Sequence, residues 1–135
     1  EAANLSSESW ILIHDSVRPF ITLNLLETAL QTAVLHGNAV CAVPVKFSVR
    51  EKTATGSKAV NREQYLEVQT PQIFTLQDLL TAYELPSFQS FTDDASLVEA
   101  SGKQVFLTQG SYQNLKITTQ EDLLLAQQIW KHLDI

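Results

Sequence analysis

Two short apolar runs, separated by one amphipathic stretch, constrain the fold of this chain more than any other feature. The first run, Trp10–Ile13, stops abruptly at His14 and Asp15, and the second occupies residues 39–43. Short continuous apolar runs are typical of strands that are covered on both faces in a parallel sheet. We therefore predict that Trp10–Ile13 is a central strand and that residues 39–43 form a second strand.

The stretch between the two runs has the pattern of a helix. Thr22 can cap its start, and Gly37 offers a stop at its end. Apolar residues recur at helical spacing between these signals, at Leu25, Leu26, Ala29, Leu30 and Ala33. A strand, a helix and a strand with connections this short predict a βαβ unit with a right-handed crossover.

Residues 46–69 interrupt this α/β pattern. Short β-prone pieces at 47–49, 59–60 and 65–68 are separated by the turn-rich segment 53–57. This arrangement predicts a β-hairpin arm that projects from the sheet. Because the arm has too little apolar surface to be stable alone, we expect it to pack against the same arm of a second subunit.

The remainder returns to α/β character, so residues 1–135 are predicted to be a single domain. Helices are expected near 75–83, 93–101 and 119–133, and strands at 105–108 and 115–117. Thr92, followed by two acids, favours the start of the second of these helices. Thr118 with Glu121 three residues later has the spacing of a capping box for the third.

Composition narrows the classes of function. The net charge of −6 argues against the broad basic surface that binds nucleic acid. No apolar stretch is long enough to cross a membrane, and the first residues lack the features of a signal peptide, so we expect a cytoplasmic protein. The single cysteine, Cys41, lies in the second apolar run and is expected to be a small buried core residue.

Polar residues that directly follow apolar runs are the first candidates for a ligand site, because ligands bind at the carboxyl ends of strands in open α/β sheets. Asp15 could bind a divalent cation or a ribose hydroxyl, and Arg18 could bind a phosphate through two N–H groups. The spacing does not separate these roles from a structural ion pair between the two. The candidate segments are residues 14–19, a turn at residues 70–72, residues 92–94, and Asn114 with Lys116.

Two of these segments have simple structural interpretations as well. Asp93 and Asp94 could bind a metal, but two acids at a helix start are the favoured interpretation, with Thr92 free to donate its hydroxyl to a ligand. Lys116 alternates with apolar neighbours and is by default a surface lysine, and Arg62 carries no signal of its own.

Taken in order, four segments closely resemble the 2-C-methyl-D-erythritol 4-phosphate cytidylyltransferase family. The first looks like its His-Asp-Ala-Ala-Arg-Pro motif and the third like its Thr-Asp-Asp-Ala-Ser segment. The match extends over nearly the whole chain. The segments are residues 13–20 (IHDSVRPF), residues 61–62 with 69–74 (NR and QTPQIF), residues 92–99 (TDDASLVE) and residues 114–123 (NLKITTQEDL).

The resemblance implies a three-layer, Rossmann-like nucleotidyltransferase fold. It also implies that a phosphate oxygen of 2-C-methyl-D-erythritol 4-phosphate attacks the α-phosphorus of CTP and expels pyrophosphate. Mg²⁺ would neutralise the triphosphate, and Asp15 would contact the substrate or the metal-nucleotide region. The family is a homodimer with interlocking arms, so Arg62 and Ser48 would serve the site of the partner subunit. The implied roles are Arg62 and Lys116 for holding the attacking phosphate, and Arg18, Thr70 and Thr92 for lining the pocket.

The chain departs from the family in two places. Where the family usually has Asp-Thr-x-Lys, this sequence has Phe47-Ser48-Val49-Arg50, so ribitol 5-phosphate is an alternative substrate. The family also places a glycine-rich loop for the triphosphate ahead of the His-Asp strand, and this sequence contains no such loop. We therefore expect this chain to be the C-terminal part of such an enzyme and inactive by itself, the alternative being a dimerising fragment without catalysis.

Overall fold

A computed structural model describes residues 5–86 and 88–132 of the chain. Its main sheet has four strands in the order β1, β5, β2, β6, and a separate hairpin is formed by β3 and β4. The strands are β1 (Trp10–Ile13), β2 (Ala39–Pro44), β3 (Arg50–Thr53), β4 (Gly56–Ala59), β5 (Leu66–Thr75) and β6 (Leu107–Gln109). The helices are α1 (Leu23–His36), α2 (Leu76–Tyr83), α3 (Asp94–Ala100) and α4 (Gln120–Lys131), with short 3-10 helices at Arg62–Gln64 and Phe88–Ser90.

The strand order corrects the prediction of a central β1 in a parallel sheet. The long strand β5 lies between β1 and β2 and runs antiparallel to both, while β2 and β6 are parallel. Within the described residues, β1 is therefore an edge strand. The predicted cover on both faces of β1 is also wrong for the described residues, since Trp10 and Leu12 on one face are exposed. An apolar run does not indicate which strand lies beside it, and β5 comes from much later in the chain.

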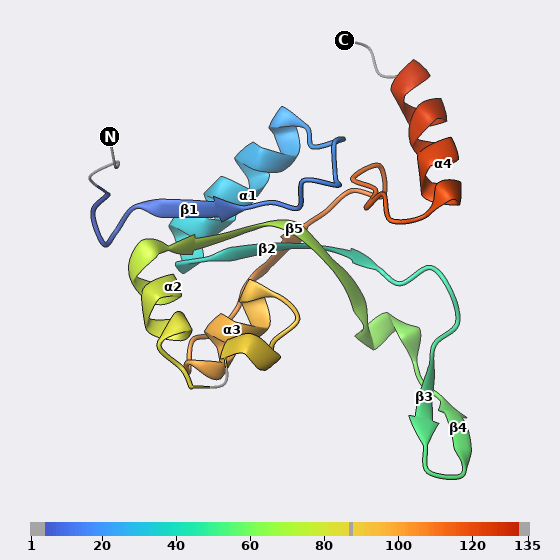
Figure 1. Cartoon of the computed structure of the whole chain (residues 1–135), viewed down its shortest axis with the longest axis horizontal. Coiled ribbons are helices and arrows are strands. Elements are labelled where there is room, and N and C mark those ends of the chain that lie inside the picture. Colours follow the sequence, from blue (N-terminus) through green and yellow to red (C-terminus); the bar gives the residue numbers. More distant parts are fainter. Residues whose placement is uncertain (1–4, 87, 133–135) are drawn as a thin grey trace.

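Helices cover both faces of the sheet, which confirms the three-layer α/β fold (Figure 1). On β2, Cys41 points to the face covered by α1, and Val40 points to the face covered by α2 and α3, as alternation along a strand requires. Ile73 and Phe74 divide in the same way on β5. Burial raises the pKa of the Cys41 thiol to about 11, so this residue is an inert part of the core, as predicted.

The ends of α1 are where the sequence placed them. The Thr22 hydroxyl accepts a hydrogen bond from the Leu25 N–H at 3.3 Å. Gly37 has a φ of 94°, in the left-handed region that favours glycine, and its N–H donates to the Ala33 carbonyl at 2.7 Å.

The starts of α3 and α4 lie one residue beyond the predicted caps. Asp93, not Thr92, caps α3, because its carboxylate reaches the Ser96 N–H. Thr119, not Thr118, caps α4, and it forms the capping box with Asp122 rather than with Glu121. The predicted helix end at residue 133 lies outside the described residues.

The predicted last strand at 115–117 is wrong. These residues form a loop between β6 and α4. The Ile117 N–H of this loop donates a backbone hydrogen bond of 2.9 Å to the Val17 carbonyl. A strand needs a ladder of such bonds, so the apolar character of Leu115 and Ile117 reflects packing and not pairing.

The arm is a two-stranded hairpin that extends away from the body of the molecule (Figure 1). Its strands lie at Arg50–Thr53 and Gly56–Ala59, so the predicted pieces at 47–49 and 59–60 were displaced, while the turn between them was placed correctly. All eight residues of the two strands are exposed. In the part of the chain that the structure describes, no helix is long and apolar enough to cross a membrane.

Candidate functional site

Five of the seven predicted site residues meet at one polar pocket of about 280 Å³. The loop after β1, strand β5, the start of α3 and the loop before α4 each form part of its wall. The predicted residues in the wall are Asp15, Arg18, Thr70, Thr92 and Lys116.

The segment at residues 70–72 reaches the pocket in a different way from the one predicted. It is not a turn but the middle of β5, where the Thr70–Pro71 peptide bond is cis and the pairing with β2 shifts between Val40 and Ala42. Proline is disfavoured inside a central strand because it has no N–H to donate, and for this reason the sequence pattern suggested a turn.

One carboxylate holds the two cations of the pocket. Asp15 Oδ2 accepts from Arg18 Nε at 3.2 Å and from Lys116 Nζ at 3.1 Å. Arg18 also donates through Nη1 to the Asn114 carbonyl at 2.7 Å, and its side chain is only 10% exposed. The ion pair that sequence spacing left open is therefore present, and Lys116 is not merely a surface lysine.

These contacts shift the ionisation of Asp15. Burial, the largest single influence, favours the neutral form and raises the pKa. The hydrogen bonds and charges of Lys116 and Arg18 together outweigh it and hold the pKa of Asp15 below its usual value of 3.8.

The pairing of Asp15 should stabilise the fold at neutral pH and cease to do so in acid. Because the folded state has the lower pKa, the stabilisation is fully present above pH 3.8 and is lost as the pH falls through the folded-state pKa. Urea unfolding of the wild type and of Asp15→Asn should therefore give free energies of unfolding whose difference shrinks in acid. A difference that stays constant from about pH 7 to about pH 2.5 would contradict this.

His14 directs the Thr70 hydroxyl. Nε2 of His14 donates to the Arg18 carbonyl at 2.9 Å, and Nδ1 of the same ring lies 3.1 Å from the Thr70 hydroxyl oxygen, within hydrogen-bond distance. The same hydroxyl oxygen accepts from the Asp15 N–H at 2.9 Å. The Thr70 hydroxyl is thus engaged on both sides, and His14 acts as a packed residue at the end of β1.

The start of α3 forms another wall of the pocket and is held in place by hydrogen bonds to the Gln72 side chain. The Gln72 side chain, 2% exposed, donates to Asp93 at 3.0 Å and accepts from the Ala95 N–H at 2.9 Å. Burial, the largest influence, raises the pKa of Asp93, but hydrogen bonds from Ser96 and Gln72 lower it below its usual value. The Asp93 carboxylate is therefore a structural cap, and Thr92 is left to line the pocket.

The loop that carries Lys116 begins at Gly110, which is closely packed. A Cβ atom at Gly110 would lie 2.5 Å from Gln69 Oε1 and 3.0 Å from the Ala42 carbonyl oxygen. Gln69 uses the same Oε1 to accept from the Ser111 N–H and uses Nε2 to donate to the Ser111 carbonyl. Gln69 thereby fastens the loop to β5.

The substitution Gly110→Ala should destabilise the protein by about 1–3 kcal/mol, because the new methyl group overlaps the Gln69 amide and the β2 backbone. Urea unfolding would measure the loss. The same substitution should cost less when Gln69→Ala is already present, since the nearest clash is then absent. Wild-type stability of Gly110→Ala would contradict the expectation.

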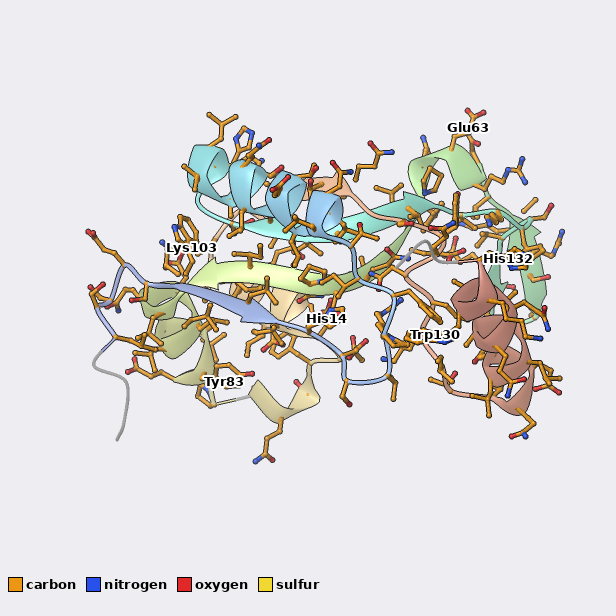
Figure 2. All side chains as sticks on the ribbon, turned by 90° about the horizontal axis from the view of Figure 1, so that it is seen from above. His14, Glu63, Tyr83, Lys103, Trp130 and His132 are labelled. Carbon is orange, nitrogen blue, oxygen red and sulfur yellow. The ribbon has the colours of Figure 1, made fainter. Side chains whose placement is uncertain are left out.

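Arg62 and Ser48 do not reach this pocket. Arg62 donates to the Lys46 carbonyl at 2.7 Å at the base of the arm, and Ser48 is exposed in the loop before β3. Figure 2 shows Glu63, next to Arg62 in the sequence, far from His14. The structure therefore leaves these two predicted residues outside the site of their own subunit.

The side chains that line the pocket carry more negative than positive charge, which disfavours a bound anion. Two cations line it, Arg18 and Lys116, against the three carboxylates of Asp15, Asp93 and Asp94. A phosphate dianion at this place would need additional positive charge.

The described residues do not by themselves form a metal cage. They contain no group of three or more His, Cys, Asp or Glu side chains placed to hold an ion, and Asp15 Oδ2 is paired with two cations. A single carboxylate still suits Mg²⁺ that is held mainly by substrate phosphates. The donor set therefore fits an ion that enters with its substrate better than one held by the protein.

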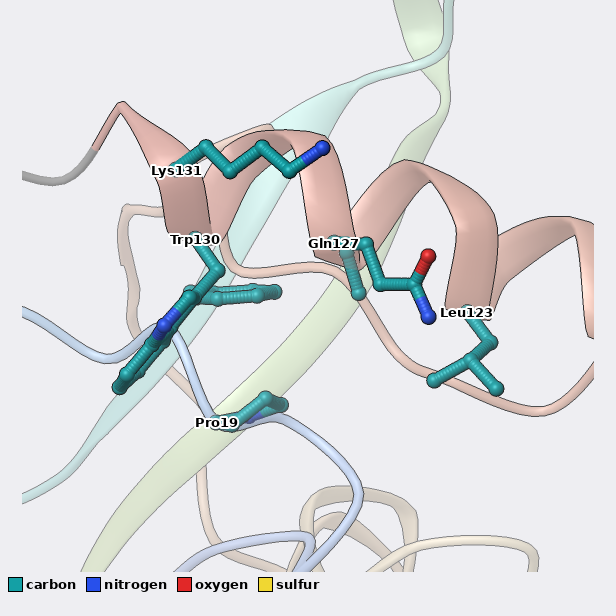
Figure 3. Close-up of a pocket in the computed structure, with 7 residues that line it drawn as sticks. Pro19, Leu123, Gln127, Trp130 and Lys131 are labelled. Carbon is teal, nitrogen blue, oxygen red and sulfur yellow. The ribbon is translucent and has the colours of Figure 1, made fainter.

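A second pocket, of about 330 Å³, lies between α4 and the loop at Pro19 and Phe20 (Figure 3). Its walls are largely apolar, with Leu123 and Trp130 supplied by α4, and Lys131 is the one charged side chain among the described residues that line it. Phosphate recognition uses several N–H groups or cations, so this pocket does not suit an anionic substrate.

Three amides organise the polar pocket without having been given a role from the sequence: Gln72 and Asn114 lie in candidate segments, and Gln69 was not a candidate. Gln69, Gln72 and Asn114 are buried amides that hydrogen-bond the backbone or side chains of the pocket walls. Each lies beside a predicted site residue, but an amide in a sequence carries no sign of its burial.

The fold and the pocket place the chain in the class of α/β cytidylyltransferases, as solved structures indicate. The 2-C-methyl-D-erythritol 4-phosphate cytidylyltransferase of Thermus thermophilus superposes with a TM-score of 0.81 at 34% identity, covering 90% of this chain and 62% of that one. The 4-diphosphocytidyl-2C-methyl-D-erythritol synthase of Anaerococcus prevotii gives a TM-score of 0.82 at 28% identity, covering 96% and 62%.

The sequence model of 2-C-methyl-D-erythritol 4-phosphate cytidylyltransferases matches residues 2–132, and the chain belongs to this family. The enzyme of that name from Bacillus cereus is 44% identical over 125 residues, which are 90% of this chain and 55% of the relative. The chain thus spans about half the length of the curated relatives it matches. The resemblance seen in the four sequence segments is confirmed.

Proposed function

We propose that the protein containing this chain transfers CMP from CTP to 2-C-methyl-D-erythritol 4-phosphate and releases pyrophosphate. The observation that carries this proposal is the convergence of Arg18 and Lys116 with two threonines, Thr70 and Thr92, in one pocket. Cations and hydroxyl groups suit a phosphate.

In the proposed reaction a phosphate oxygen of the polyol phosphate attacks the α-phosphorus of CTP. A new P–O bond forms there as the bond to the pyrophosphate oxygen breaks, and pyrophosphate leaves with that electron pair. The protein contributes position and charge. Lys116 would hold the attacking phosphate, exchanging part of its contact with Asp15 for a contact with the substrate, and Arg18 would form the wall beside it.

We propose that Arg62 and Ser48 act in the site of a partner subunit, within a homodimer joined through the arms. Arg62 lies outside the pocket of its own subunit, and in that pocket the three carboxylates outnumber the two cations. A guanidinium delivered by the arm of a second copy would raise the number of cations to three and balance the three carboxylates. The exposed hairpin at Arg50–Thr53 and Gly56–Ala59 is the element that would reach across.

Mg²⁺ is the proposed metal, bound chiefly by triphosphate oxygens with Asp15 as the nearest carboxylate of this chain. When bound, it would neutralise charge on the triphosphate. Both substrates are water-soluble anions, and the proposed location is the cytoplasm.

Pyrophosphate release by the full-length protein tests the proposal, with CTP, Mg²⁺ and either 2-C-methyl-D-erythritol 4-phosphate or ribitol 5-phosphate. Turnover with the first substrate and not the second is the expected result. Turnover only with ribitol 5-phosphate would contradict the substrate. No release with either polyol phosphate would contradict the activity.

A further inference from the structure

Asn114 lies completely buried in the loop between β6 and α4, where it contacts the walls of the polar pocket. Its side chain Nδ2 donates to the Thr70 carbonyl of β5 at 2.7 Å. Its own carbonyl accepts from Arg18 Nη1 at 2.7 Å, and its N–H donates to the Ser111 carbonyl at 3.0 Å. One residue thus joins the loop after β1, strand β5 and the loop that carries Lys116.

We infer that Asn114 is the positioning residue that sets Arg18, Thr70 and Lys116 relative to one another around the bound polyol phosphate. The inference rests on the proposed function, because it assigns a role within that pocket. Asn114 lies two residues before Lys116, so a displacement of its backbone moves both the acceptor of Arg18 and the lysine.

The chemistry of the side chain explains why an amide is needed here. The Thr70 carbonyl accepts from a buried donor, which excludes an ionised aspartate or an apolar residue of similar size. Among the described residues, Asn114 Oδ1 is a buried side-chain atom that has no hydrogen-bond partner. An unpaired buried acceptor costs free energy, which packing alone would not explain. The hydrogen bond donated by the same side chain to the Thr70 carbonyl, which holds two chain segments together, explains it.

Asn38 provides a matched control because it is also a buried asparagine that ties together two chain segments. It is 4% exposed, its Nδ2 donates to the Gln104 carbonyl at 2.8 Å, and its Oδ1 accepts from the Phe106 N–H at 2.8 Å. It does not line the polar pocket. Asn38→Asp and Asn114→Asp therefore remove the same donor from a backbone carbonyl at two different places.

The test compares full-length wild type, Asn114→Asp and Asn38→Asp by thermal unfolding and by steady-state kinetics. For Asn114→Asp we expect kcat/KM for 2-C-methyl-D-erythritol 4-phosphate to fall roughly ten- to hundred-fold, with the KM for CTP unchanged. For Asn38→Asp we expect a comparable loss of thermal stability with wild-type kinetics. Equal kinetics in the two variants, or an equal rise in both KM values for Asn114→Asp, would overturn the positioning role.

A second variant and a binding measurement cover the remaining outcomes. If Asn114→Asp does not fold, Asn114→Ser replaces it, since the hydroxyl is a smaller donor that retains the polar character of the site. If the wild type shows no turnover, the proposed function fails separately, and calorimetric binding of 2-C-methyl-D-erythritol 4-phosphate to the same proteins decides the inference. Wild-type affinity in the Asn114 variant would then overturn it.

Discussion

Replacing Lys116 by methionine in the full-length protein should lower kcat/KM for 2-C-methyl-D-erythritol 4-phosphate by about 10²- to 10³-fold. The substitution preserves most of the side-chain volume and removes the charge that is proposed to hold the attacking phosphate. Pyrophosphate release under steady-state conditions measures the effect. The loss should fall mainly on the polyol phosphate, because the lysine is proposed to act on the attacking group and not on CTP.

Lys103→Met is the matched control for this prediction. Lys103 is 52% exposed and paired with Asp78, while Lys116 is 48% exposed and paired with Asp15, so both substitutions remove a lysine of similar exposure from a pair with one carboxylate. A partly exposed pair of this kind contributes about 0–1 kcal/mol to stability. Similar activities of the two variants would show that Lys116 has only a structural role.

Mixing two inactive variants, Arg62→Ala and Lys116→Met, should restore about a quarter of the wild-type specific activity. If each site uses Lys116 of one subunit and Arg62 of the other, a mixed dimer has one intact site and one doubly defective site. About half of randomly formed dimers are mixed, and half of their sites are intact. The measurement is pyrophosphate release after the two proteins have been unfolded, mixed and refolded together.

The control mixture is Arg18→Ala with Lys116→Met. These two residues line the same pocket of one subunit, so no mixed dimer regains a complete site. Recovery in the first mixture that does not exceed recovery in this one would contradict the delivery of Arg62 by a partner subunit.

Apolar spacing predicted most helices of the fold well because burial patterns are local, whereas the three layers were implied by the family resemblance. Apolar spacing identified α1, and Thr22 and Gly37 marked its ends. The order of the strands was beyond such reasoning, since β5 enters between β1 and β2 from a distant part of the chain and pairs antiparallel to both. Alternation along a strand contains no information about the identity of its neighbour.

The prediction of the site was incomplete for a similar reason, because its contacts join distant parts of the chain. Asp15, Arg18 and Lys116 were each singled out, but the sharing of one Asp15 oxygen by both cations depends on a tertiary contact across about a hundred residues of sequence. Asn114 and Gln72 belonged to candidate segments but were given no role, because an amide looks like an ordinary surface residue until the fold encloses it. Motif resemblance identified the polar segments that meet, whereas physical contacts identify what holds them together.

The excess of carboxylates over cations in the pocket links two equilibria in the proposed enzyme. A lone subunit presents Arg18 and Lys116 against three acids and disfavours a dianion, and Arg62 from a second copy would reduce this penalty by balancing the three acids. Association of the subunits would then strengthen substrate binding, and bound substrate would strengthen association by the same free energy. The abundance of the protein in a cell would determine what fraction of its sites is competent, as well as how many sites exist.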